Sequence, residues 1–320
     1  MCNNQYNFKK MTKLSIVIPV YFNEQNLYET YTALKQKVFE ELIKKNFDYE
    51  LIFVDDGSLD DSYKILLELK QQDSKIKIIK LSRNFGSINA CFAGISIAKG
   101  DCLVQISADL QDPPELILNM LEKWQKGYKI TIATRQNRDD PFFSKICSLF
   151  FYKIFRFIAQ KNIPKNGFDY YLIDKKVIDF LKSHSERNTF LPSLVLWSGY
   201  KYAEIPYDRK KRSKGKSRWT FAKKFNYFVD SITAFSYTPI RFVTLIGIIL
   251  AFLSTVYLAI IFVNYFFNKS TIQGWPSLAS LIVFSFGVQM MSIGIIGEYL
   301  WRTLDTSRAR PNYIIEEIID

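Results

Sequence analysis

Two long apolar runs near the C-terminal end of the sequence restrict the possible folds more than any other feature. The first runs from Phe242 to Phe267 without a charged residue, and the second runs from Ser277 to Trp301 with only Glu298 charged. A helix rises about 1.5 Å per residue, so either run is long enough to cross a hydrocarbon core about 30 Å thick. The sequence therefore predicts two transmembrane helices, over about 242–267 and 277–301, in a hairpin at 241–304.

The charges on either side of this hairpin predict its orientation. Basic residues are enriched on the cytoplasmic side of membrane proteins, and both flanks of the hairpin are basic. The flanking residues are Lys223, Lys224 and Arg241 before it, and Arg302, Arg308 and Arg310 after it. We therefore expect a multi-pass protein of the inner cell membrane, with both termini, the preceding domain and a tail over 305–320 in the cytoplasm.

The segment before the hairpin is first basic and then amphipathic. The stretch RKKRSKGKSRW is either a solvated surface loop or a site for anionic lipid head groups. In residues 219–240, apolar side chains recur at helical spacing, namely Phe221, Phe225, Phe228, Val229, Ile232 and Phe235. This pattern is typical of a helix in the membrane interface, and a helix packed on the soluble domain is the alternative.

Strand-like and helix-like blocks alternate over residues 13–218, which follow a short tail at 1–12. The runs LSIVIPVY and YELIFVDDGS indicate buried strands, and NEQNLYETYTALKQKVFEEL has helical spacing. This alternation predicts an α/β domain with a Rossmann-like, mostly parallel sheet and helices on both faces. In such domains, ligands bind beyond the carboxyl ends of the strands.

Residues that could bind a ligand follow three of the predicted strands. They are Pro19, Tyr21, Asn23 and Glu24 after the first, Asp55, Asp56, Gly57 and Ser58 after the second, and Asp109, Gln111 and Asp112 after the fourth. Any one group is ordinary turn chemistry. Together at one sheet edge, they predict a site where an aspartate accepts a hydrogen bond from a nucleotide base. Carboxylate and amide oxygens there would hold Mg²⁺ or Mn²⁺ beside a phosphate.

Several other kinds of site do not fit the sequence. No GxxxxGK[ST] motif is present and no GxGxxG follows the first strand, which counts against a P-loop and a dinucleotide-binding oxidoreductase. The one histidine, His184, excludes a multi-histidine zinc site. Four cysteines without paired spacing favour a reducing compartment over a disulfide framework.

Four motifs, IVIPVYFNEQN, VDDGSLDDS, LSRNFGSINACFAGISIAKGD and ISADLQDPPELI, occur in this order along the chain. Together they resemble the family 2 glycosyltransferases of the GT-A fold. More narrowly, they are similar to the polyprenyl-phosphate glycosyltransferases, such as dolichol-phosphate mannose synthase and the bactoprenol glycosyltransferases. The resemblance continues through ATRQNR, GFDYYLIDKKV, IPYDRKKRSKGKSRW and GEYLWRTLDTSRARP, so it covers nearly the whole chain.

The resemblance implies roles for individual residues. Asp109 and Gln111 are implied to hold the divalent metal, and Asp109, Arg135 and Asp169 are the implied catalytic residues. The residues implied to bind the nucleotide sugar are Pro19, Tyr21, Glu24, Asp55, Asp56, Asn84, Gly86, Ser107 and Asp109. Those implied to bind the lipid phosphate or the diphosphate are Arg135, Arg209, Arg212, Ser217 and Arg218.

Two departures from the family pattern bear on the site. Ser107 stands where the family often has the first aspartate of Asp-x-Asp, which removes one negative charge and leaves Asp112 or a water to compensate. The family's Gly-Asp-Phe-Arg segment reads GFDYYLID, so that Asp169 aligns with its aspartate and Tyr171 replaces its arginine.

The resemblance implies transfer of a sugar, with inversion, from a nucleotide sugar to a polyprenyl phosphate such as undecaprenyl phosphate. The donor is expected to be UDP-linked and the partners to include membrane lipids but no nucleic acid. A processive polysaccharide synthase and a non-catalytic nucleotide-sugar-binding membrane protein are the alternatives. Glycines in the second apolar run would permit the close helix packing of a homo-oligomer, namely Gly287, Gly294 and Gly297.

Overall fold

The computed structural model describes residues 11–136, 151–184, 186, 189–210, 221–268 and 274–320. The chain forms two compact units. The first, here called the sheet unit, comprises Met1–Ser231 and Pro311–Asp320. The second, the helical unit, comprises Ile232–Arg310 and is therefore inserted between two parts of the sheet unit.

The sheet unit alternates strands and helices along most of its length, as the sequence predicts. Its strands are β1 (Thr12–Val20), β2 (Phe47–Asp55), β3 (Ile76–Leu81), β4 (Cys102–Gln105), β5 (Ile130–Arg135), β6 (Tyr170–Asp174), β7 (Tyr202–Tyr207) and β8 (Ile315–Ile319). Its helices include α1 (Leu27–Leu34), which continues through a π-helical stretch (Lys35–Phe39) into α2 (Glu40–Lys44), then α3 (Ser62–Gln72), α4 (Ser87–Ile97), α5 (Leu116–Gln125), α7 (Lys175–Ser183) and α8 (Leu191–Trp197).

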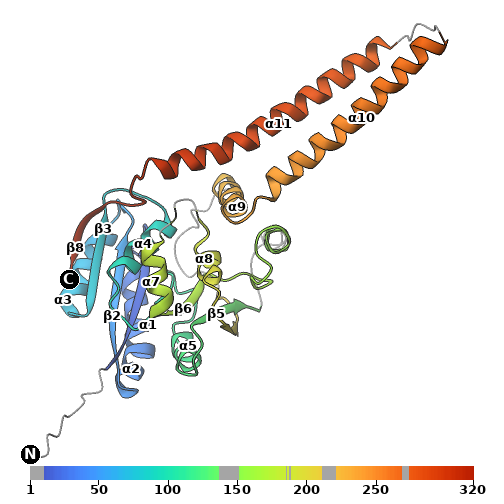
Figure 1. Ribbon diagram of the computed structural model, residues 1–320. Helices are drawn as coiled ribbons and strands as arrows, with labels where there is room; N and C mark the ends of the chain where they lie inside the picture. The colour runs from blue at the N-terminus through green and yellow to red at the C-terminus, as the bar shows by residue number, and fades with distance from the viewer. Residues whose placement is uncertain (1–10, 137–150, 185, 187–188, 211–220, 269–273) are drawn as a thin grey trace, which may run out of the picture. The chain divides into compact units, whose positions relative to one another are not determined.

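The strands form an eight-stranded sheet in the order β7-β5-β6-β4-β1-β2-β3-β8 (Figure 1). The pairs β1–β2, β2–β3, β1–β4 and β5–β7 are parallel. Strands β6 and β8 run antiparallel to their neighbours, so the other strands share one direction. The predicted mostly parallel α/β sheet is thereby confirmed.

Helices cover both faces of the sheet because its central strands are apolar on both sides. In β1, Ile16 and Ile18 belong to the core that also receives side chains from α1, α2, α3 and α5. Val17 points to the other face, where a Cβ added to Gly94 of α4 would lie only 2.4 Å from Val17 Cγ1. Glycine at position 94 therefore lets α4 approach the sheet closely.

The end of the chain forms a strand that the sequence did not predict. Residues 305–320 were expected to be a tail, but β8 lies beside β3 (Figure 1) and pairs antiparallel with it. Ile319 lies opposite Ile78 and Ile315 lies opposite Leu81. The apolar and acidic residues of IEEII are suited to an edge strand, since isoleucine favours strands and charge discourages further pairing. The short length of this segment and its separation from β3 along the chain hid the pairing.

Helix α9 (Phe221–Phe235) follows the basic segment, and its residues up to Ser231 belong to the sheet unit. The Tyr227 ring lies 5.4 Å from that of Phe190, and the Phe228 ring lies 5.7 Å from that of Phe151. These contacts favour the second of the two sequence-based alternatives for this part of the helix, namely packing on the soluble domain.

The helical unit contains α10 (Thr238–Asn268) and α11 (Trp275–Ser307), which span both of the predicted apolar runs. By length and composition, one stretch of the described chain could cross a membrane, Thr238–Tyr257, with a mean hydropathy of 2.0. None of its apolar window is buried within the structure. A core helix of a soluble domain would be covered by other elements, and this stretch is not.

Candidate active site

The parallel pairing of β1, β2 and β4 brings their carboxyl ends to one edge of the sheet, as expected from the sequence. Val20 at the end of β1 lies opposite Asp55 at the end of β2, and the Ile106 amide after β4 donates to Val17 O at 3.1 Å. The loop after β4 is tied to the helix after β1, because Thr30 Oγ1 donates to Ala108 O at 2.8 Å. The three polar strand ends therefore form one continuous edge.

The loops after β1 and β2 fix each other's conformation. The Phe22 amide donates to Ser58 Oγ at 3.1 Å, and the Asp61 amide donates to Glu24 Oε2 at 3.1 Å. Pro19 is the last but one residue of β1, and the Tyr21 amide donates to Asn23 Oδ1 at 2.9 Å. Much of the hydrogen bonding in these loops is thus made between the two strand ends.

Asp56 holds a third loop, which follows β3. Its carboxylate accepts hydrogen bonds from the Phe85 amide at 2.7 Å and from the Gly86 amide at 2.9 Å. Burial raises the pKa of Asp56 to about 6, although the two amides oppose that rise. Asn84 is exposed in the same loop, and its backbone lies against Gly57, where an added Cβ would be 2.8 Å from Asn84 N.

Asp55 ends β2 and is fully buried. Its Oδ1 accepts from the Ser58 amide at 3.3 Å, whereas its Oδ2 has no hydrogen-bond partner among the described residues. Burial raises the pKa of this carboxyl. An unpaired buried oxygen costs free energy, so a ligand N–H that reaches Asp55 Oδ2 would supply the missing bond.

The end of β4 brings two carboxylates together around one hydroxyl. Ser107 Oγ lies 2.8 Å from Asp109 Oδ1 and 3.2 Å from Asp112 Oδ2. A serine hydroxyl has a single proton and can donate to only one of them at a time. The two carboxylates are only 6% and 3% exposed, so negative charge is concentrated here. Ser107, which replaces the first acid of Asp-x-Asp, thus links Asp109 to a nearby acid three positions further on.

Two arginines offset this charge from the other side. Arg209 Nε lies 3.5 Å from Asp112 Oδ1, and Arg135 donates to Asp169 Oδ2 at 2.6 Å. Burial lowers the pKa of Arg135, but the charge of Asp169, together with Tyr207 and Asp112, outweighs burial and raises it. Arg135 therefore remains a buried cation at the edge of the site.

Tyr207 connects the acidic and basic groups, and sequence reasoning missed it. Its hydroxyl donates to Asp112 Oδ1 at 2.5 Å and accepts from Arg135 Nε at 3.4 Å. Tyr207 ends β7, which pairs with β5 so that Tyr207 lies opposite Arg135. The only sequence signal was its position in IPYDR, directly before the basic run.

Two backbone conformations mark the same edge. Phe22, after β1, has φ 56° and Leu110, after β4, has φ 55°. Left-handed backbone in non-glycine residues costs free energy and is enriched at binding sites. Both residues lie in loops that carry the predicted site residues.

The oxygens after β4 fit a hard divalent cation only in part. Mg²⁺ and Mn²⁺ accept carboxylate and amide oxygens and are often held by one or two protein carboxylates together with substrate phosphates. Asp109 offers a carboxylate beside that of Asp112, and the Gln111 side chain is close by, donating from Nε2 to Lys210 O at 3.3 Å. No group of three or more His, Cys, Asp or Glu side chains suited to a metal occurs in the described part of the chain. A cation there would therefore need oxygens from a bound diphosphate.

Three predicted phosphate-binding residues, Arg212, Ser217 and Arg218, lie outside the described residues. The remaining predicted residues gather into two groups. Those after β1, β2 and β3 are Pro19, Tyr21, Glu24, Asp55, Asp56, Asn84 and Gly86. Those around β4 to β7 are Ser107, Asp109, Gln111, Arg135, Asp169 and Arg209.

Comparison with known proteins gives matches over most of the chain. The sequence model described as "Glycosyl transferase family 2" matches residues 15–178. Uncharacterized glycosyltransferase YkcC of Bacillus subtilis (strain 168) is 40% identical over 304 residues, which cover 95% of this chain and 93% of the relative. The prophage bactoprenol glucosyl transferase homolog of Escherichia coli (strain K12) is 34% identical over 307 residues, with 96% and 99% covered. The solved mannosyl-3-phosphoglycerate synthase from Rubrobacter xylanophilus has a TM-score of 0.47 and 14% identity, covering 68% of this chain and 71% of its own.

Proposed function

The chain belongs to glycosyl transferase family 2, and on that basis we propose a membrane-anchored, inverting enzyme that transfers a sugar from a UDP-linked donor to a polyprenyl phosphate. The sheet unit is a GT-A-like α/β domain, and the chain is a glycosyltransferase. The product would be a polyprenyl-phosphate sugar, which serves in the modification of cell-surface glycans.

One observation carries the proposal: the buried acidic and basic cluster after β4, next to the loops after β1, β2 and β3. Asp109 and Asp112 share the Ser107 hydroxyl. Arg209 pairs with Asp112, and Arg135 pairs with Asp169. A nucleotide diphosphate needs this combination, because its charge must be balanced by a cation and by arginines. Its base and ribose would lie toward Asp55 and Asp56.

The proposed reaction needs little acid–base chemistry. A phosphate oxygen of the acceptor attacks the anomeric carbon, a new C–O bond forms, and the bond from that carbon to the donor diphosphate breaks. UDP leaves with the electron pair, and attack from the opposite side inverts the anomeric centre. A phosphate monoester is already anionic near neutral pH, so no general base is required, in agreement with the single histidine of the chain.

The residues of the chain would position the two substrates and balance their charge. Arg135, held by Asp169 and Tyr207, would face the phosphate charge that develops on the leaving UDP. Asp109 and Gln111 would hold a divalent cation against the donor diphosphate. When bound, Mg²⁺ or Mn²⁺ supplies positive charge that stabilises the departing phosphate.

The acceptor side rests on the relatives and on the helical unit. A relative at 34% identity is named as a bactoprenol glucosyl transferase homolog, which supports a polyprenyl phosphate acceptor. The unburied apolar stretch of α10 supports anchoring in a membrane, and we propose that α10 and α11 form the expected hairpin. Arg209, together with Arg212, Ser217 and Arg218, would then bind the acceptor phosphate near the bilayer surface.

The proposal is tested by a transfer assay on the full chain purified in detergent. The mixture contains undecaprenyl phosphate, Mg²⁺ or Mn²⁺ and one of a panel of radiolabelled nucleotide sugars. We expect label from one donor to enter the organic phase, and EDTA to abolish that transfer. Product with undiminished yield in EDTA would contradict the metal, and label in a polymer would indicate the processive alternative. Binding of UDP without transfer from any donor would favour the non-catalytic one.

A further inference from the structure

Strand β8 reaches the nucleotide edge of the sheet from outside the four family motifs. Its antiparallel register with β3 places Ile315 opposite Leu81, at the carboxyl end of β3. Just beyond the paired residues, the Ser82 amide donates to Ile314 O at 3.0 Å. The amino end of β8, which lies at the nucleotide edge, thus holds the first residue of the loop that follows β3.

That loop is the one whose amides bind Asp56. At the start of loop 82–86, Ser82 bonds Ile314; at its end, the Phe85 and Gly86 amides donate to the Asp56 carboxylate. Its middle lies against Gly57, where an added Cβ would be 2.6 Å from Arg83 C. The loop is therefore fixed at one end by β8 and at the other by Asp56.

Side chains repeat this connection. Lys80 Nζ lies 2.9 Å from Glu316 Oε1, and the Tyr63 hydroxyl donates to Glu317 Oε2 at 2.6 Å. Lys80 Nζ also lies 5.0 Å from the centre of the Tyr63 ring. Glu316 and Glu317 therefore hold Lys80 of β3 and Tyr63 of α3 beside β8.

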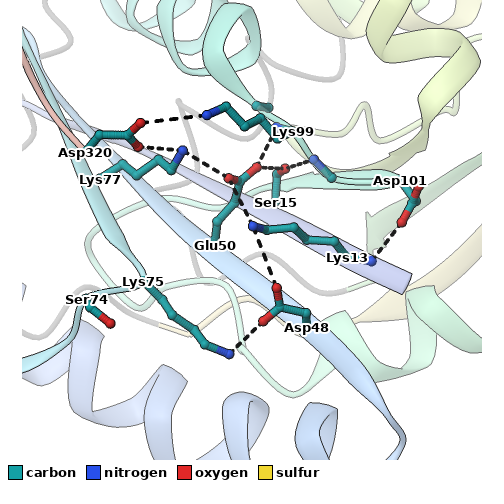
Figure 2. Close-up of polar contacts among 12 residues, drawn as sticks. Lys13, Ser15, Asp48, Glu50, Ser74, Lys75, Lys77, Lys99, Asp101 and Asp320 are labelled. Atoms are coloured by element: carbon teal, nitrogen blue, oxygen red, sulfur yellow. Dashed lines mark hydrogen bonds and ion pairs between the residues drawn. The ribbon is translucent and has the colours of Figure 1, made fainter. Parts of the chain in front are cut away.

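The far end of β8 is anchored separately. Figure 2 shows Asp320 paired with Lys77 and Lys99, at 2.6 Å and 3.7 Å. Lys77 is shared with the buried Glu50, at 3.5 Å. These contacts lie at the amino end of β3, opposite to the nucleotide edge, so they offer a matched control for the contacts at the site end.

We propose that β8 is a positioning element of the nucleotide site: through Ile314, Glu316 and Glu317 it holds loop 82–86 where its amides meet Asp56. The proposal rests on the proposed function for the identity of the ligand, but the positioning itself concerns the chain alone. None of the β8 residues touches a reacting atom. The strand follows α11 in the chain, so under this proposal residues C-terminal to the helical unit help to position the donor site.

Charge reversal at either end of β8 tests the proposal in the full chain. Glu316→Lys replaces the carboxylate that lies 2.9 Å from Lys80 Nζ with a like charge, and Asp320→Lys does the same beside Lys77 and Lys99. Hydrogen exchange of residues 82–86 is followed by mass spectrometry, and UDP binding with Mn²⁺ by calorimetry. For Glu316→Lys we expect the hydrogen-exchange rate of the loop and the Kd for UDP each to rise about threefold or more. The reason is that the variant loses an ion pair and gains a repulsion between like charges. For Asp320→Lys, both should stay within about twofold of wild type.

Deletion of residues 314–320 gives a second measurement. We expect faster exchange of loop 82–86 in this variant, and recovery when a synthetic peptide of residues 311–320 is added, since a free strand can pair with an exposed sheet edge. The proposal would be overturned if loop 82–86 exchanged at the wild-type rate in both Glu316→Lys and the deletion variant. It would also be overturned if the two charge reversals changed the loop exchange rate and the Kd for UDP equally. If the wild-type chain does not bind UDP, the proposed donor is wrong, while the exchange data still decide the role of β8.

Discussion

At the scale of single residues, the site depends on charge that is buried and shared. Ser107 bridges two nearly buried carboxylates, and Tyr207 joins one of them to Arg135. Such a network stabilises its charges only while every member is present, because a buried charge without its partner is costly. Substitution of one member is therefore expected to lower stability as well as activity, so folding has to be measured beside transfer.

Asp109→Asn preserves the size of the side chain and removes its charge. If Asp109 holds the metal, we expect the transfer rate to fall by about 100-fold or more, since loss of a metal or charge-stabilising contact costs several kcal/mol in the transition state. The measurement is label transfer to the lipid at saturating Mn²⁺, with thermal unfolding in detergent as a check of folding. Asp179→Asn is the control, because Asp179 is an exposed residue of α7 paired with Lys175 at 3.9 Å. Near-normal transfer by Asp109→Asn would refute the metal assignment.

Asp56 predicts a pH dependence of donor binding. Its pKa is raised from 3.8 to about 6, first of all by burial, so the native state binds this proton more tightly than the unfolded chain does. The contribution of this carboxyl to stability therefore falls as the pH rises from about 4 to about 6. Protonation below about 6 also weakens the hydrogen bonds from Phe85 and Gly86.

We therefore expect donor affinity to decrease as the pH is lowered through about 6. The nucleotide sugar identified by the transfer assay is the appropriate ligand, because its diphosphate does not titrate in this range. In Asp56→Asn the affinity should be lower at pH 7 and should no longer fall as the pH is lowered through about 6. An unchanged pH profile in this variant would show that another group titrates.

At the scale of elements, the loops at the sheet edge are held in place by contacts with each other. Gly57 is an example, since it has φ 67° and its missing side chain leaves room for the backbone of Arg83 and Asn84. The loops after β2 and β3 meet at this glycine. Only glycine satisfies both the conformation and the close approach.

Gly57→Ala is expected to lower stability and donor affinity together. The added Cβ would lie 2.6 Å from Arg83 C, so the loop that bonds Asp56 must move. Gly127→Ala is the matched control, because Gly127 has φ 98° but no atom within 4 Å of an added Cβ. The control bears only the cost of backbone strain, of order 1–3 kcal/mol, so we expect a lower melting temperature in both variants but weaker donor binding only in Gly57→Ala. Equal donor affinity in the two variants would contradict the role of this contact.

The sequence predicts much of this architecture because the signals are local. The strands around LSIVIPVY and YELIFVDDGS, the helices between them and the polar strand ends are each encoded within about twenty residues, by periodicity and turn chemistry. The contacts that complete the site are not local. Tyr207 meets Asp112 across 95 positions and Lys80 meets Glu316 across 236. No pattern within a short segment reports such pairs, so Tyr207 and β8 were missed.

At the scale of the whole molecule, the sheet unit and the helical unit differ in how much of their apolar surface is buried. The sheet unit buries it between strands and helices, whereas the apolar window of α10 is unburied. An unburied apolar stretch of this length is stable when a bilayer covers it. This difference supports the proposed membrane anchor.

A charge in the middle of α10 tests this interpretation. Ile249 lies in the stretch Thr238–Tyr257 and is exposed, and an arginine at the centre of a membrane helix costs about 2.5–3.5 kcal/mol on insertion scales. We expect wild-type protein to stay in the membrane fraction after carbonate extraction and Ile249→Arg to be partly released. Ile314→Arg is the control, because Ile314 is about as exposed as Ile249 but lies outside the apolar stretch, and this variant should leave the fractionation unchanged. Wild-type protein in the carbonate supernatant would refute the membrane anchor.

The order of the elements along the chain also has a consequence for biosynthesis. Because the helical unit precedes β8 in the chain, a ribosome completes both long helices before it makes the strand that pairs with β3. Until then the nascent sheet has an open β3 edge, the kind of surface on which other strands add and chains aggregate. Sheet completion therefore comes after the apolar helices have left the ribosome, and a chain that stalls before residue 311 carries an unprotected β3 edge.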